Sequence, residues 1–278
     1  MKFVNNIWIF VNIAIIMRFR VKCFFDNLHY CKTNLVTNPP TLYMISPQQN
    51  HLQNKKILSI SPGGYKGFYV LGICKYIKEN YCLRDYVFSG ASAGAWNSLM
   101  LCSHIDIPKI QKKILDKSFS KIDSIYELEN QIKHKFLDNY KTRDFDLSRL
   151  YVGVTTLHNY KSNIIIYNGF ENLEDALNCC IASSHIPFLT GGLTNVYRKT
   201  LSFDGGFSPY PYLNTSETAL HIYPNIWNHF STNKSVFNLS DYTTLLSKSK
   251  FPFEEMIENG YLDTKQNAKQ LDIIFKNK

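Results

Sequence analysis

The sequence predicts an α/β protein in which a mainly parallel sheet lies between layers of helices. Three observations support this fold class. Residues 57–78 and residues 86–101 each read as a short apolar strand, a glycine turn and a helix. Such repeated units favour a parallel sheet flanked by helices. The chain has 278 residues, of which 45% are hydrophobic, and this is enough for a sizeable core.

In the first unit, residues 57–60 are apolar and the sequence Pro62-Gly63-Gly64 ends them. Apolar residues then recur at helical spacing over residues 68–78. The second unit has a strand over residues 86–89 and a helix through residues 95–101. A small-residue turn separates them. We therefore expect two neighbouring parallel strands, each followed by a helix.

The remaining elements follow from the same periodicities. In chain order they are a helix over residues 107–134, a strand pair over 149–157 and 163–167, a helix over 173–183, a strand over 201–203, and helical segments over 253–257 and 268–275. Asn172 is a candidate N-cap, and Glu174 and Asp175 in the first turn complement the helix dipole.

The N-terminal part of the chain differs in composition from the rest. Residues 33–54 are rich in Asn, Pro, Gln and Thr, which predicts a linker. We therefore divide the chain into an extension over residues 1–54 and a folded domain over residues 55–278. The apolar run over residues 7–17 is too short to span a bilayer. A packed extension, an interfacial membrane anchor and a targeting signal remain open for it.

The charge and cysteine content restrict the class of protein. The net charge of +9 favours anionic surfaces such as phospholipid headgroups, and no nucleic-acid-binding motif is present. We expect no nucleic-acid partner. Seven scattered cysteines show neither a disulfide framework nor CxxC pairs, so they fit a reducing compartment. We expect an intracellular protein, either cytoplasmic or at the periphery of a membrane.

The turn of the second unit matches the GxSxG pattern, in which a strand-to-helix turn presents a serine nucleophile. This nucleophile elbow consists of Gly90, Ala91, Ser92, Ala93 and Gly94. The helix that follows would stabilise negative charge at its N-terminus. An alternative is that the Ser92 side chain only caps this helix.

The turn of the first unit, from Pro62 to Gly67, is the second chemical signal. Its bare backbone amides could converge on an anion, as an oxyanion hole requires. A phosphate-binding loop is the rival interpretation, but the Walker pattern GxxxxGK[ST] is absent. The third signal is Asp204, which follows the strand over residues 201–203. Gly205 and Gly206 come directly after it.

These three signals lie at the ends of strands, which share one edge in an open α/β sheet. Together they resemble, in order, the motifs of the patatin-like phospholipases. Residues 175–188 and 253–263 also resemble segments of that family. The resemblance covers roughly residues 55–275 and implies a three-layer α/β/α fold.

The resemblance also implies roles for individual residues. Ser92 would be the nucleophile and Asp204 the proton acceptor, without metal or cofactor. The oxyanion hole would use the amides of Gly63 and Gly64, with Lys66 and Gly67 in support. Pro62 lacks an N–H group and so removes one possible donor. In addition, Ser61 stands where the family usually has Asp.

The implied substrates are phospholipid or acylglycerol esters at a lipid surface, and no protein partner is predicted. Aromatic residues beside the motifs are candidates for an acyl channel, namely Trp96, Phe68, Tyr69 and Phe207. Two other functions remain open. One is a hydrolase with a Ser92, Asp204 and His221 triad. The other is an inactive lipid-binding module.

Overall fold

In the computed structural model, the described residues are 41–44, 52, 55–116, 125–158, 161–208, 210–213, 218–227 and 253–275. The chain divides between Pro39 and Pro40, and all the described residues belong to the second unit. The apolar run over residues 7–17 therefore lies outside the described residues, as do Cys23 and Cys31.

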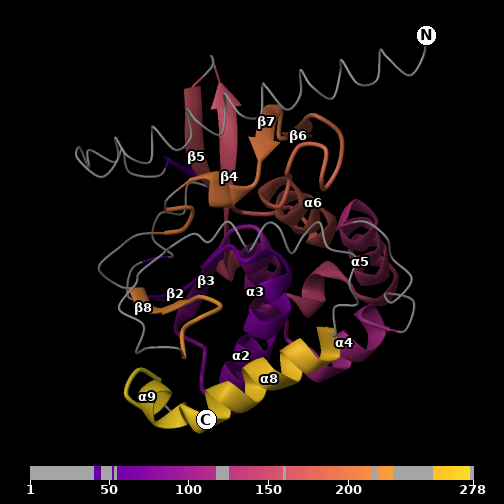
Figure 1. Cartoon of the computed structure of the whole chain (residues 1–278). Coiled ribbons are helices and arrows are strands. Elements are labelled where there is room, and N and C mark those ends of the chain that lie inside the picture. The colour runs from indigo at the N-terminus through magenta and orange to yellow at the C-terminus, as the bar shows by residue number, and fades with distance from the viewer. Residues whose placement is uncertain are drawn as a thin grey trace, which may run out of the picture. The chain divides into compact units, whose positions relative to one another are not determined.

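A mostly parallel sheet forms the centre of this unit, in the order β1-β5-β4-β3-β2-β8, with β7 beside β4 and β6 beside β7 (Figure 1). The strands are β1 (Thr41–Met44), β2 (Lys56–Ile60), β3 (Tyr86–Gly90), β4 (Leu150–His158), β5 (Lys161–Asn168), β6 (Asn195–Tyr197), β7 (Thr200–Phe203) and β8 (Thr218–Ile222). Four pairs of neighbouring strands are parallel: β4 with β3, β3 with β2, β2 with β8, and β1 with β5. The pairs of β4 with β5 and with β7 are antiparallel.

Helices complete the fold. They are α2 (Gly67–Asn80), α3 (Ala93–Cys102), α4 (Ile107–Ile114), α5 (Ile125–Asn139), α6 (Leu173–Ser183), α8 (Phe253–Gln266) and α9 (Ala268–Asp272). The 3₁₀ turn η2 (Gly64–Lys66) follows β2, and the 3₁₀ turn η6 (Gly205–Phe207) follows β7. The predicted α/β/α class with a mainly parallel central sheet is confirmed.

Most predicted elements are present within a few residues of the expected bounds. Asn172 caps α6 as predicted, because its Oδ1 accepts from the Asp175 amide at 2.9 Å. The single helix predicted over residues 107–134 is wrong. Leu115 leaves helical geometry with φ −98° and ψ 61°, so α4 ends at Ile114 and α5 begins at Ile125.

Strands β1, β6 and β8 were not predicted. Strand β1 lies inside the stretch interpreted as a linker and pairs in parallel with β5. The boundary between residues 54 and 55 remains a prediction. None of the helices among the described residues is long and apolar enough to cross a membrane.

Alternate residues of the strands face two apolar clusters, as a period of two requires. On one face, Leu58 and Phe88 pack in the cluster that contains Ile73 of α2 and Leu99 of α3. On the other face, a smaller cluster contains residues from β2, β3, β4 and β5. The strand ends that carry the motifs are therefore anchored in a core from both sides.

Candidate active site

Ser92 lies in a sharp turn between β3 and α3. Its φ of 52° and ψ of −129° are unfavourable for a residue with a side chain, and such strain persists only where surrounding packing imposes it. That packing is tight. A Cβ atom on Gly94 would lie 2.2 Å from the Ile60 carbonyl oxygen of β2. The Ser92 side chain does not cap α3, so the capping alternative is wrong.

The Ser92 hydroxyl instead donates to Asp204. Its Oγ lies 2.7 Å from Asp204 Oδ2, and both residues are buried, with exposed fractions of 7% and 2%. Asp204 follows β7, which pairs with β4, and β4 pairs with β3. The sheet therefore brings together two residues that are 112 positions apart in the chain.

Two further hydrogen bonds hold the Asp204 turn. Asp204 Oδ1 accepts from the Gly206 amide at 2.6 Å, and the Asp204 amide donates to the His185 carbonyl at 2.7 Å. Gly205 allows close packing, since a Cβ atom there would lie 2.4 Å from the Gly153 carbonyl oxygen. The Asp-Gly-Gly sequence thus fixes the orientation of the carboxylate.

Burial raises the pKa of Asp204 from 3.8 to about 6, and the hydrogen bonds from Ser92 and Gly206 limit the rise. A general base is most effective when its pKa lies near the working pH. At neutral pH this carboxylate is mostly ionised and yet more basic than an exposed aspartate. The environment therefore suits Asp204 to accept a proton from Ser92.

Ser183, the last residue of α6, supports the elbow from behind. The Ser92 amide donates to Ser183 Oγ at 2.8 Å, and Ser183 Oγ donates to the Gly153 carbonyl at 2.7 Å. This link joins the elbow to β4 through a buried side chain. Our sequence interpretation placed Ser183 in a family-like segment and assigned it no role. Nothing in the sequence pairs it with Ser92.

The turn after β2 brings backbone amides to the same region. Gly64 has a φ of 51°, in the left-handed region that favours glycine, and it lines the same cavity as Ser92. Within the described part of the chain, the Gly63 and Gly64 amides donate no hydrogen bond. Both therefore remain able to bind an anion, although Gly63 is not among the residues that line the cavity.

Gly67 and Lys66 differ from these two glycines. The Gly67 amide is already bonded within the turn, to the carbonyls of Gly64 and Tyr65. Its lack of a side chain is needed for packing, because a Cβ atom would lie 2.6 Å from Ala93 Cβ. Lys66 donates its amide to Gly63 and does not line the cavity. Gly67 lines the cavity, so it shapes both the turn and the cavity wall, whereas Lys66 contributes to the turn alone.

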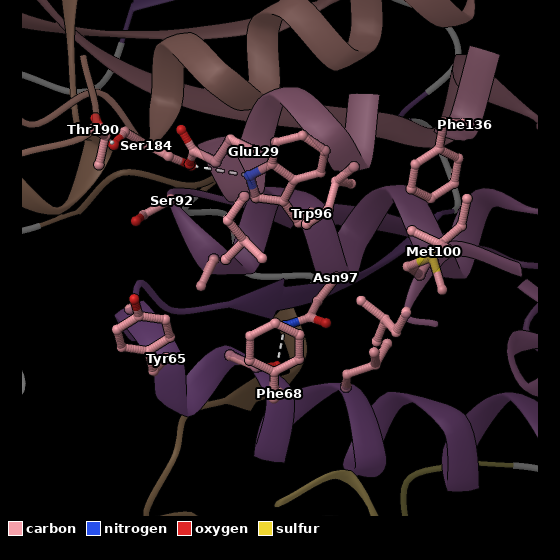
Figure 2. A pocket seen from close by; sticks show the side chains of 18 of the residues that line it. Tyr65, Phe68, Ser92, Trp96, Asn97, Met100, Glu129, Phe136, Ser184 and Thr190 are labelled. Atoms are coloured by element: carbon pink, nitrogen blue, oxygen red, sulfur yellow. Dashed lines mark hydrogen bonds between the residues drawn. The ribbon is translucent and has the colours of Figure 1, made fainter. Parts of the chain in front are cut away.

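An apolar cavity opens beside Ser92 (Figure 2). It encloses about 930 Å³, a figure that includes space open to solvent. Helices α2 to α5 line it with apolar side chains, among them Leu71, Met100, Ile114, Leu128, Ile132 and Phe136. Figure 2 shows Ser92, Ser184 and Thr190 at one end, with Met100 and Phe136 at the other.

Two of the four aromatic residues proposed for an acyl channel line this cavity, namely Phe68 and Trp96. The other two do not. The Tyr69 hydroxyl donates to Asp263 Oδ2 of α8 at 2.6 Å, because a helix directs successive side chains to different faces. Phe207 is 37% exposed and lies outside the lining.

The structure does not assemble a triad with His221. This residue lies on β8, with Nδ1 3.0 Å from Ser59 Oγ of β2, and its ring packs against Tyr212. The two carboxylate oxygens of Asp204 accept from Ser92 and Gly206 instead. Burial lowers the pKa of His221. His221 is therefore a packing residue of the sheet.

Glu129 of α5 is a cavity residue that no sequence motif indicated. It is only 6% exposed, and within the described structure its Oε2 atom has no hydrogen-bond partner. Burial raises its pKa well above 4.5; interaction with Ser184 opposes the rise, and the charge of Asp204 adds to it. Ser184 Oγ accepts from Trp96 Nε1 and donates to the Cys180 carbonyl, both at 3.0 Å. Its one proton is thus already used.

No group of three potential metal ligands occurs in the parts of the chain that the structure describes. The five cysteines there are free, and burial raises the pKa of Cys74, Cys102, Cys179 and Cys180. A raised pKa keeps a thiol protonated and unreactive.

The fold and site together define an α/β protein with a strand-end serine, a buried carboxylate and an adjacent glycine turn. Comparison with known proteins agrees with this class. Residues 58–162 match the family model described as patatin-like phospholipase, which confirms the predicted resemblance for that part of the chain. The match contains both glycine turns and Ser92 and ends before Asp204.

Among solved structures, the chain is similar to VipD from Legionella pneumophila, with 17% sequence identity and a TM-score of 0.33. The similarity covers 63% of this chain and 50% of VipD, so the chain spans about half the length of that protein. No curated protein matches the sequence.

Proposed function

We propose that this protein is a serine lipid acyl hydrolase that cleaves fatty-acyl esters with a Ser92–Asp204 dyad. The observation that carries the proposal is the 2.7 Å hydrogen bond from Ser92 Oγ to Asp204 Oδ2 at one end of an apolar cavity. The family match over residues 58–162 supports lipid acyl hydrolysis at the level of the family.

In the acylation step, Ser92 Oγ attacks the ester carbonyl carbon while Asp204 accepts the Ser92 proton. The carbonyl oxygen becomes an oxyanion, which accepts hydrogen bonds from the Gly63 and Gly64 amides. Collapse of this intermediate breaks the ester bond, and Asp204 returns the proton to the leaving alcohol. The product that remains is an acyl ester of Ser92.

In the deacylation step, Asp204 takes a proton from a water molecule that attacks the acyl carbonyl. The same amides stabilise the second oxyanion. When it collapses, the fatty acid leaves and Ser92 Oγ recovers the proton from Asp204. The Ser183 link matters in both steps, because it fixes the backbone that carries the nucleophile.

The cavity supports the choice of substrate. Its apolar lining between α2 and α5 suits a fatty-acyl chain whose ester carbonyl lies at Ser92. We therefore propose phospholipid or acylglycerol esters as substrates, in keeping with the family description. Residues 1–54 remain a predicted extension with a possible role at a membrane.

A fluorophosphonate probe and a fatty-acid release assay on phospholipid vesicles test the proposal. We would compare the wild type with Ser92→Ala, Asp204→Asn and His221→Ala. The dyad requires that labelling and release vanish in Ser92→Ala, collapse in Asp204→Asn and persist in His221→Ala. Loss in a folded His221→Ala variant would favour a triad. A folded wild type that neither labels nor hydrolyses would favour the inactive lipid-binding module.

A further inference from the structure

Exposed apolar side chains are concentrated in the stretch of chain that contains Asp204. Among the described residues, the large hydrophobic side chains that are at least a third exposed are Tyr126, Phe188, Leu193, Val196, Phe207, Tyr210, Leu262 and Ile273. Only Leu262 and Ile273 belong to the C-terminal helical segment. Five of the other six lie between Ser183 and Leu213, the stretch that contains Asp204. Where such side chains form a contiguous patch, the patch marks an interaction surface.

Three of these residues lie on two neighbouring segments, and we call them the apolar rim: Tyr126, Phe188 and Leu193. Their exposed fractions are 55%, 60% and 59%. The Phe188 amide donates to the Gly192 carbonyl at 3.2 Å, which closes the loop between Phe188 and Leu193. A Cβ atom on Gly191 would lie 3.6 Å from the Tyr126 ring, so the loop packs beside the start of α5.

The same two segments also line the cavity. Ile186 and Thr190 of the loop face it, as do Leu128 and Glu129 of α5. Thr190 Oγ1 accepts from the Ile186 amide and donates to the Ser184 carbonyl, which holds the loop against the polar end of the cavity. The apolar rim therefore belongs to the two segments that line the cavity beside Ser92. Figure 2 shows Ser184 and Thr190 of one segment and Glu129 of the other.

Two features of Phe188 carry a cost in free energy: its backbone conformation and the exposure of its side chain. Its φ of 65° lies in the left-handed region, where a bulky side chain is strained, and most of its ring is exposed to water. A ligand that covers the ring would remove the second cost.

We propose that the apolar rim inserts into a lipid surface and brings the cavity to its substrate there. The proposal rests on the proposed function, because an acyl ester in a bilayer must leave that surface to reach Ser92. The rim adjoins the cavity end at which the ester would bind. The net charge of +9 adds attraction to anionic headgroups, whereas rim insertion requires only apolar contact.

The test uses the full chain with Ser92→Ala, so that vesicles are not consumed during the measurement. Binding would be measured by flotation with phosphatidylcholine vesicles, with and without phosphatidylserine. We expect the double variant Phe188→Ser and Leu193→Ser to bind about 25-fold more weakly, because each partly covered apolar side chain contributes roughly a factor of five. The matched control is Leu262→Ser with Ile273→Ser, which removes two exposed apolar side chains elsewhere and should bind normally.

A second readout separates this proposal from the proposed function. With Ser92 intact, the rim variant should lose activity on vesicles relative to its activity on a soluble short-chain ester. Labelling by fluorophosphonate reports that the variant is folded. If the wild type binds vesicles but hydrolyses no ester, the result would support the rim proposal and contradict the proposal that the protein is a hydrolase. Equal binding by the rim variant and the control, or no binding by the wild type, would overturn the rim proposal.

Discussion

Two buried carboxyl groups line the cavity, and they lie in different surroundings. Asp204, in the turn after β7, accepts one hydrogen bond from the Ser92 hydroxyl and another from the Gly206 amide. Glu129, on α5, has no hydrogen-bond partner for Oε2 within the described structure. Its neighbour Ser184 already donates to the Cys180 carbonyl. Burial raises both pKa values, to about 6 for Asp204 and well above 4.5 for Glu129.

The two carboxyl groups differ more in their hydrogen-bond donors than in their burial. The exposed fractions are 2% for Asp204 and 6% for Glu129, so loss of solvent acts on both. The donors aimed at Asp204 recover part of the lost hydration. At neutral pH the cavity therefore carries a charged base beside Ser92, and the carboxyl group on its wall is the harder of the two to ionise relative to water, because burial raises its pKa well above 4.5. A second charge at Glu129 would raise the pKa of Asp204 further.

The largest effect should come from replacing the charged member of the pair. Asp204→Asn keeps the shape of the side chain but cannot accept a proton at neutral pH. We expect fatty-acid release to fall by about 10³-fold or more, since general-base catalysis contributes up to about 10⁴-fold. Initial rates on phospholipid vesicles would measure this. A rate within tenfold of the wild type would exclude Asp204 as the base.

The same substitution should make the protein more stable. The pKa of Asp204 is raised in the folded state, so ionisation there costs folding free energy. The cost is absent below about pH 4, grows up to about pH 6, and stays constant above that. A shift from 3.8 to about 6 corresponds to about 3 kcal/mol. Urea unfolding should show Asp204→Asn to be more stable at about pH 8 and equal to the wild type at about pH 4. A less stable variant at the higher pH would contradict this account.

The sequence predicted the carboxyl group at a strand end, Asp204, and missed the one on a helix, Glu129. Gly90, Gly94 and Asp204 lie in short patterns whose geometry is local, so the sequence alone indicated them. The site also depends on contacts between distant segments. Ser183 reaches the Ser92 amide only because α6 packs against β4, and Glu129 reaches the cavity only through the packing of α5. No local pattern encodes such contacts.

The bounds of two elements, α4 and β1, also depend on more than local sequence patterns. The break after Ile114 was not predicted because apolar spacing continues beyond it, whereas the backbone at Leu115 leaves the helix. Strand β1 is short and lies in a polar stretch, and it forms through pairing with β5. The two strand–turn–helix units were predicted well because strand, glycine turn and helix are adjacent in sequence.

The pH dependence of wild-type catalysis should follow the charged carboxyl group. Asp204 must be deprotonated to act as a base, and its pKa is about 6. We expect kcat/KM to be constant above about pH 7 and to fall about tenfold per pH unit below pH 6. Hydrolysis of a soluble ester over this range would measure the profile. A midpoint near 4 would show that Asp204 is not desolvated during catalysis.

The smallest effect should come from Glu129→Gln, which tests whether the second carboxyl group is neutral. Glutamine has the shape of a protonated glutamate and no charge. If Glu129 is already neutral, kcat/KM should stay within about twofold of the wild type and the midpoint near pH 6 should not move. If Glu129 were ionised, removing its charge would lower the pKa of Asp204 and shift the profile to lower pH. The pH profiles of the variant and the wild type would be measured on the same soluble ester. A midpoint that moves to lower pH would show that Glu129 is ionised, and an unchanged midpoint would show that it is neutral. A loss of packing alone would change the rate without moving the midpoint.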